Sequence, residues 1–253
     1  GGTNKERLVS VASAQALHRA LPGAELWFWD VDDTVHAVTS EQLLGHARPF
    51  EVDFRPPGHG IALDQALDKA SAEQRVLVLG LHGGRAENGE LQAMCEMRGV
   101  AFTGSGSAAS QLAFDKPSAK RFAAIAGINA PQGISVEQID DAFAKHGKLI
   151  AKPAKDGSSY GLIFVNAQQD LVAVRNAAKH EDYLIEPFVS GVEATCGGGR
   201  LRLHSQIPFE VDSGDLSRPV RARGQRRDHG PCVAGAPRAV LHRLLAERLH
   251  RVG

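Results

Sequence analysis

Apolar residues recur along the chain at spacings that separate helices from strands. Between Arg7 and Leu21, apolar side chains return every three or four positions, which predicts a helix that ends at Pro22-Gly23. The segments Glu25–Trp29 and Arg75–Leu81 are largely apolar, as expected of strands that are buried on both faces. Because strands of this kind alternate with helices, we predict an α/β lobe that is built on a parallel sheet.

The same reasoning extends to the middle of the chain, where the character of the sequence changes at Pro131. Spacing and glycine stops predict three further helices and three further strands. These are helices over residues 90–98, 118–126 and 171–178, and strands over residues 148–153, 162–165 and 183–189.

Composition places the chain among ordinary globular proteins. Hydrophobic residues make up 43% and charged residues 23%, which excludes a collagen or a disordered tail protein. No apolar run approaches the roughly 20 residues that span a bilayer, and no leader is recognised at the start, so we expect no membrane association. The three cysteines are odd in number and lack zinc-site spacing, so a reducing cytoplasm is the expected location.

The net charge of zero hides an uneven distribution of charge. Residues 197–253 hold 11 arginines, no lysine and five acidic residues. Phosphate-binding surfaces normally mix lysine with arginine, so we do not expect nucleic-acid binding. Arginine, glycine, proline and histidine without lysine are typical of a GC-rich gene read out of frame. We therefore predict an aberrant Arg-rich tail from about residue 197.

Three glycine-rich turns could bind an anion through their backbone N–H groups. They lie at Gly1-Gly2, at Gly83-Gly84 and at Gly157–Gly161, and each is also compatible with a plain tight turn. The third turn follows Lys152 and Lys155, which could supply the positive charge that a phosphate requires. None has the spacing of a P-loop.

The acidic segment Asp30–Thr34 admits two interpretations. An apolar strand that runs into D-x-D-x-T resembles the first motif of haloacid-dehalogenase phosphatases, in which Asp30 would be the nucleophile and Asp32 an acid/base. Such an enzyme also needs a later acidic pair for Mg²⁺, and the adjacent pair at Asp140-Asp141 lies in a polar helical stretch. The alternative is a solvated acidic loop.

Five segments, taken in order, resemble the D-alanine–D-alanine ligases of the ATP-grasp superfamily. Each is similar to one motif of that family, and together they extend over residues 1 to 196. They are Gly1–Ala14, Leu81–Gln92, Phe102–Ser110 with Phe114–Lys120 behind it, Lys152–Gly161 and Leu184–Glu193.

The resemblance implies an α/β fold of three lobes. Residues 1–115 would form an amino-terminal parallel-sheet lobe that binds substrate. Residues 116–184 would form the central ATP-grasp lobe that binds nucleotide. Residues 185–253 would begin a carboxy-terminal ATP-grasp lobe, which we expect to be incomplete because of the tail.

The activity that the resemblance implies is the ATP-dependent ligation of two D-alanine molecules through an acyl-phosphate, for peptidoglycan precursors in the bacterial cytoplasm. The carboxylate of Glu6 would hold the ammonium group of the first D-alanine, with His82 nearby, and Ser158 would position substrate and close the site. The implied contacts to ATP come from Lys116 and Lys152 at the phosphates, from Glu186 and Val189 at adenine, and from Glu193 at the ribose.

The sequence also departs from the family pattern. The family places a strand before the first motif and, after Cys196, a lid with tyrosine and lysine and then an arginine and Mg²⁺ ligands, which are not recognised here. Glu210, Asp212 and Asp215 are oxygen donors, but their spacing is not that of the family.

A second hypothesis is therefore a catalytically inactive product that binds nucleotide or D-alanine weakly. Within the superfamily, D-lactate or D-serine could replace the second D-alanine. If the protein forms an oligomer, we expect it to be a homodimer.

Overall fold

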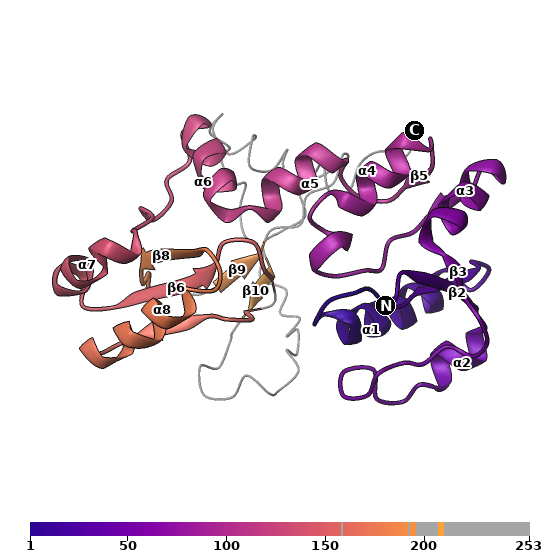
Figure 1. Cartoon of the computed structure of the whole chain (residues 1–253), viewed down its shortest axis with the longest axis horizontal. Coiled ribbons are helices and arrows are strands. Elements are labelled where there is room, and N and C mark those ends of the chain that lie inside the picture. The colour runs from indigo at the N-terminus through magenta and orange to yellow at the C-terminus, as the bar shows by residue number, and fades with distance from the viewer. Residues whose placement is uncertain (158, 192, 196–206, 210–253) are drawn as a thin grey trace, which may run out of the picture.

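The computed structural model of the chain describes residues 1–157, 159–191, 193–195 and 207–209. Figure 1 shows an amino-terminal lobe and a central lobe, each built from strands and helices, while helices α5 and α6 run along one side of the molecule between them. The α/β class is thereby confirmed. The predicted limits of the lobes at residues 115 and 184 stay predictions.

The amino-terminal lobe contains two separate sheets with helices between their strands. One sheet has the order β1-β2-β3 and is antiparallel, and the other joins β4 and β5 in parallel. The parallel pair was expected, whereas the antiparallel sheet was not. The elements are α1 (Arg7–Ala20), β1 (Leu26–Trp29), β2 (Thr34–Val38), α2 (Ser40–Gly45), β3 (Ile61–Ala62), α3 (Leu63–Ala72), β4 (Val76–Leu77), η1 (Gly84–Ala86), α4 (Glu90–Met97) and β5 (Ala101–Phe102).

The segment Asp30–Thr34 forms the turn of a β-hairpin, which explains why β1 and β2 are antiparallel. The Asp30 N–H donates to the Thr34 carbonyl at 2.8 Å, and Asp33 has a positive φ of 62°. Asp32 Oδ1 accepts the backbone N–H and the hydroxyl of Thr34 at 3.1 and 2.6 Å. Acidic side chains that accept bonds from two residues further on are typical of turns.

Strand β4 is shorter than the apolar run Arg75–Leu81 predicts. The Thr103 N–H donates to the Leu77 carbonyl at 2.9 Å, and the Thr103 hydroxyl accepts the Leu79 N–H at 3.0 Å. Because a side chain takes the N–H of Leu79, the backbone ladder ends at Leu77. The chain then continues without regular structure to the turn at Gly83.

The central lobe is an antiparallel sheet of order β7-β6-β8 with helices packed against it. Its core residues, including Ile139, Leu149, Val165 and Ile185, are almost completely buried. The elements from α5 onward are α5 (Ser107–Phe114), α6 (Lys116–Ile125), η2 (Val136–Gln138), α7 (Ile139–His146), β6 (Leu149–Pro153), β7 (Ile163–Val165), η3 (Gln168–Asp170), α8 (Leu171–Ala177), β8 (Tyr183–Pro187), β9 (Glu193–Thr195) and β10 (Ile207–Phe209).

Within the part of the chain that the structure describes, no helix combines the length and the apolar character that crossing a membrane requires. The predicted Arg-rich tail lies outside the described residues, except for the short strand β10.

The core of the amino-terminal lobe provides a test of the packing. Leu67 is 2% exposed in a cluster that includes Trp29, whereas Leu44 on α2 is 40% exposed. Leu67→Ala should lower the free energy of unfolding by about 2–5 kcal/mol, because it leaves a cavity in a dense core. Leu44→Ala should lower it by no more than about 1 kcal/mol.

Denaturant unfolding followed by tryptophan fluorescence measures this difference, because Trp27 and Trp29 both belong to or pack against that core. Equal losses for the two leucine variants would contradict the packing described here.

Candidate functional site

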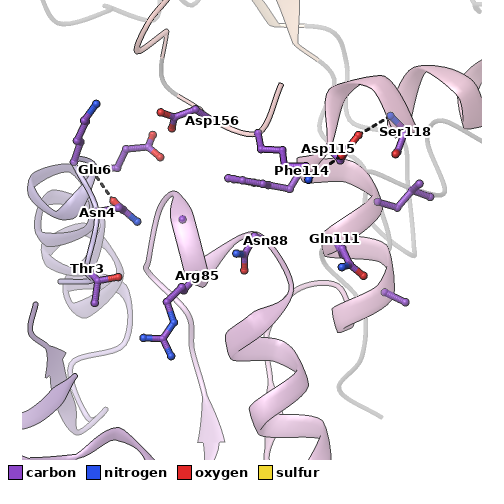
Figure 2. Close-up of a pocket in the computed structure, with 15 residues that line it drawn as sticks. Thr3, Asn4, Glu6, Arg85, Asn88, Gln111, Phe114, Asp115, Ser118 and Asp156 are labelled. Atoms are coloured by element: carbon purple, nitrogen blue, oxygen red, sulfur yellow. Dashed lines mark hydrogen bonds and ion pairs between the residues drawn. The ribbon is translucent and has the colours of Figure 1, made fainter. Parts of the chain in front are cut away.

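A cleft of about 1060 Å³ opens between the amino-terminal lobe, helices α5 and α6, and the loop after β6. Figure 2 shows polar side chains that converge on it from all three sides, with Glu6 and Asp156 at one end and Gln111 at the other. The lining residues are Thr3, Asn4, Lys5, Glu6, Gly84, Arg85, Asn88, Ala108, Gln111, Leu112, Phe114, Asp115, Ser118, Lys155 and Asp156.

The carboxylate of Glu6 occupies the point where glycine turns from the two lobes meet. Glu6 immediately precedes helix α1 and is 4% exposed. A Cβ atom built on Gly83 would lie 1.9 Å from Glu6 Oε2, and one built on Gly157 would lie 3.3 Å from the same oxygen. Gly83 also has a φ of +70°, which side chains disfavour. Glycine at position 83 is therefore required by both the backbone and the neighbouring carboxylate.

A hydrogen-bond network fixes the first motif against the second. The Asn4 amide donates to the His82 carbonyl at 3.0 Å, and its oxygen accepts the Glu6 N–H at 2.7 Å. The buried Ser10 hydroxyl accepts the His82 N–H at 2.9 Å. These bonds join the start of helix α1 to the turn at Gly83 and explain how residues far apart in sequence orient the Glu6 carboxylate.

The imidazole of His82 points to the helix side of this network. Its Nε2 is 2.7 Å from the Ser13 hydroxyl, and its Nδ1 is 3.9 Å from a carboxylate oxygen of Glu87. The structure thus brings His82 and Glu6 to one glycine turn, although the His82 side chain does not line the cleft itself.

A second group of charges lies where helix α6 contacts the central sheet. Glu186 is buried and forms ion pairs with Lys120, through Oε1, and with Lys152, through Oε2 at 2.5 Å. The Lys116 ammonium donates to the carbonyls of Pro153, at 2.8 Å, and Asp156. The group holds three lysines and one carboxylate, and its net positive charge suits a phosphate-bearing ligand.

Burial lowers the pKa of all three lysines in this group. For Lys116 and Lys120 the main cause is desolvation, and the nearby charge of Lys152 lowers the pKa further. For Lys152 desolvation alone is the cause. An anion bound here would offset this desolvation and raise each pKa again.

The remaining residues singled out from the sequence fall at the edge of the described structure or beyond it. Val189 is exposed just after β8, on the segment that also carries Glu186. Glu193 belongs to β9, but its side chain lies outside the described residues, as do Ser158 and the acidic residues Glu210, Asp212 and Asp215. Their predicted roles stay predictions.

The structure adds two features that sequence reasoning did not assign to the site. Lys120 belongs to the lysine group, and its spacing of four from Lys116 on a predicted helix was the available signal. Lys5 lies 5.8 Å from the centre of the Tyr160 ring, in the third glycine-rich turn. This cation–π contact is a second point at which the first and fourth motifs meet.

Asp30 does not have the surroundings of a phosphatase nucleophile. Its Oδ1 accepts the Val31 N–H at 2.7 Å and pairs with Arg7 at 2.9 Å, while Asp33 pairs with Arg85 at 2.7 Å. Within the described residues, no group of three His, Cys, Asp or Glu side chains could hold a metal ion. The aspartates of this segment build a hairpin turn, and the phosphatase interpretation is not favoured.

Comparison with known proteins identifies the family. Residues 1–105 match the family model "D-ala D-ala ligase N-terminus". The D-alanine–D-alanine ligase of Gluconobacter oxydans is 32% identical over 99% of this chain and 77% of its own length. The chain belongs to the D-alanine–D-alanine ligase family.

Another ligase of the family, from Halalkalibacterium halodurans, is 29% identical over 77% of this chain. The present chain spans 57% of the length of that relative. The crystal structure of the Helicobacter pylori D-alanine–D-alanine ligase aligns with 98% of this chain and 81% of its own, with a TM-score of 0.66 and 21% identity. That likeness confirms the ATP-grasp ligase fold.

The contact between Gly83 and Glu6 generates a prediction for this ligase-family chain. Gly58 has nearly the same φ, +73°, but nothing lies within 4 Å of a Cβ atom built on it. Gly58→Ala should lose about 1–2 kcal/mol of stability from backbone strain at positive φ. Gly83→Ala should lose at least about 1 kcal/mol more, because a φ of +70° with a ψ of 172° is a conformation that essentially only glycine adopts and because the methyl group displaces the Glu6 carboxylate.

Denaturant unfolding of both variants measures this difference. Equal losses of stability would show that the carboxylate moves aside freely and is not held at the turn.

Proposed function

We propose that the chain supplies the substrate-binding and nucleotide-binding parts of an ATP-dependent D-alanine–D-alanine ligase. The γ-phosphoryl group of ATP is transferred to a carboxylate oxygen of the first D-alanine, which gives an acyl-phosphate and ADP. The amine of the second D-alanine then attacks the acyl carbon. The new C–N bond forms as the C–O bond to phosphate breaks, and phosphate leaves with that electron pair.

The buried carboxylate of Glu6 is the observation that supports this proposal most directly. It lies on the wall of a large cleft, at the meeting point of two glycine turns. A carboxylate in such a position pairs well with an ammonium group that has left water, because each charge compensates the other. Glu6 therefore holds the ammonium of the first D-alanine. His82 helps to orient the Glu6 carboxylate, because its backbone bonds to Asn4 and Ser10 hold the Gly83 turn against the start of helix α1.

The lysine group supplies the second half of the site. Lys116 and Lys152 contact the ATP phosphates, where fixed cations balance the charge that moves during phosphoryl transfer. Glu186 and the backbone of Val189 meet adenine, Glu193 meets the ribose, and Ser158 positions substrate. Support comes from the joint placement of Lys116, Lys152 and Glu186 where helix α6 meets the central sheet.

Magnesium is the metal that the family implies. The described residues contain no donor set of three carboxylates, histidines or cysteines that would fit it, so no step is assigned to the metal here. A cytoplasmic location and a homodimer remain parts of the proposal, as does D-alanine rather than D-lactate or D-serine as the second substrate.

The role of Glu6 leads to a specific prediction. Glu6→Gln keeps the size of the side chain but removes the charge that pairs with the ammonium group. We expect kcat/KM for D-alanine to fall about 100-fold or more, because a buried ion pair loses one partner. The affinity for ATP should not change, because Glu6 lies outside the lysine group. Coupled assays of ADP release and isothermal titration with ATP measure the two quantities.

Glu51→Gln is the matched control, because the Glu51 side chain is exposed and forms a surface ion pair with Arg48. Its kinetics should equal those of the unmodified chain. If the unmodified chain releases no ADP with saturating ATP, Mg²⁺ and D-alanine, the ligase proposal fails. The inactive, weakly binding product is then the correct description.

A further inference from the structure

Helix α6 directs two lysines onto the central sheet, and only the first of them has a role in the proposed function. Lys116 and Lys120 are one helical turn apart, so they share a face of α6. Lys116 reaches backbone carbonyls at the end of β6, whereas Lys120 reaches the Pro131 carbonyl and the Glu186 carboxylate. The second lysine therefore pairs directly with a group of the nucleotide site.

Strand register explains why Glu186 has two cationic partners. Residue Ile150 of β6 lies opposite Glu186 of β8, and Lys152 lies opposite Leu184. Glu186 and Lys152 are therefore diagonal neighbours on the same face of the sheet, within reach of a long side chain. Lys120 approaches the other carboxylate oxygen from the helix, so the buried carboxylate is held between sheet and helix.

The two lysines are not equivalent in their surroundings. The side chain of Lys120 is 22% exposed and is anchored to both Glu186 and Pro131. The side chain of Lys152 is 30% exposed, and its ion pair is with Glu186. Lys152 can thus turn toward a phosphate at the cost of one ion pair, provided that the buried carboxylate keeps another partner.

We infer that Lys120 is a positioning residue for the nucleotide. It retains the Glu186 carboxylate when Lys152 leaves that carboxylate for a phosphate of ATP, and this inference rests on the proposed function. Without Lys120, Lys152 stays on Glu186, because its departure leaves a buried charge without compensation. The affinity that Lys152 contributes toward the phosphates is then lost, although Lys120 never touches the nucleotide.

The test compares ATP with adenosine, which has no phosphate, by isothermal titration of the full chain. Lys120→Met should weaken ATP binding by about tenfold and leave adenosine binding unchanged. Lys120→Arg keeps the charge and should restore ATP binding. Arg121→Met is the control, because it removes a cation from the next position of α6, which is exposed and contacts Ser118.

Repeating the Lys120→Met substitution in a Glu186→Gln variant separates a positioning role of Lys120 from a purely structural role. In Glu186→Gln the carboxylate is gone, so Lys152 is already released and Lys120→Met should have no further effect on ATP binding. A structural role instead predicts equal effects in both backgrounds and a parallel loss of adenosine binding, and that result would overturn the inference. If Lys120→Met does not fold, Lys120→Gln, which still donates to the Pro131 carbonyl, takes its place.

The outcomes also separate this inference from the function on which it rests. If the unmodified chain binds neither ATP nor adenosine, the proposed function fails and the inference fails with it. If the unmodified chain binds ATP and Lys120→Met binds it equally well, the inference alone is wrong.

Discussion

The carboxylate of Glu6 constrains both lobes, because it lies where two glycine turns come closest. Gly83 of the amino-terminal lobe and Gly157 of the central lobe approach the same carboxylate oxygen. The position before helix α1 suits a negative charge, since the helix dipole is positive at that end. A buried anion thus defines where the backbones of the two lobes must run, and the cleft opens directly beside it.

Glu6 lines the cleft and the lysine group does not, but the charges of these two groups match the proposed substrates. The amino-terminal lobe contributes a buried carboxylate, and the junction of α6 with the central sheet contributes a surplus of lysines. A ligand pair that contains one ammonium group and several phosphate oxygens compensates both. Desolvation lowers the pKa of Lys116, Lys120 and Lys152, and an anionic ligand would offset that desolvation.

Hydrophobic spacing in the sequence predicted only some of the elements, and the helices α2, α3 and α5 were not among them. The helices α1, α4, α6 and α8 and the strands β1, β6, β7 and β8 are confirmed with small differences at their ends. The hairpin at Asp30–Thr34 and the early end of β4 were missed, because side chains decide them. Asp32 bonds to Thr34 within the turn, and Thr103 takes the N–H of Leu79. Such side-chain hydrogen bonds do not change the spacing of apolar residues, so the hydrophobic pattern does not predict them.

The candidate site shows the same division between local and long-range information. The family resemblance singled out Glu6, Lys116, Lys152 and Glu186, but it did not reveal which of these groups contact one another. The ion pair of Lys120 with Glu186 joins residues 66 positions apart, and it depends on how α6 lies across β6 and β8. Helical spacing shows that Lys116 and Lys120 share a face, whereas only packing shows that this face meets a buried carboxylate. The second partner of Glu186 is therefore a property of the folded chain, and it is the contact on which the proposed role of Lys152 at a phosphate depends.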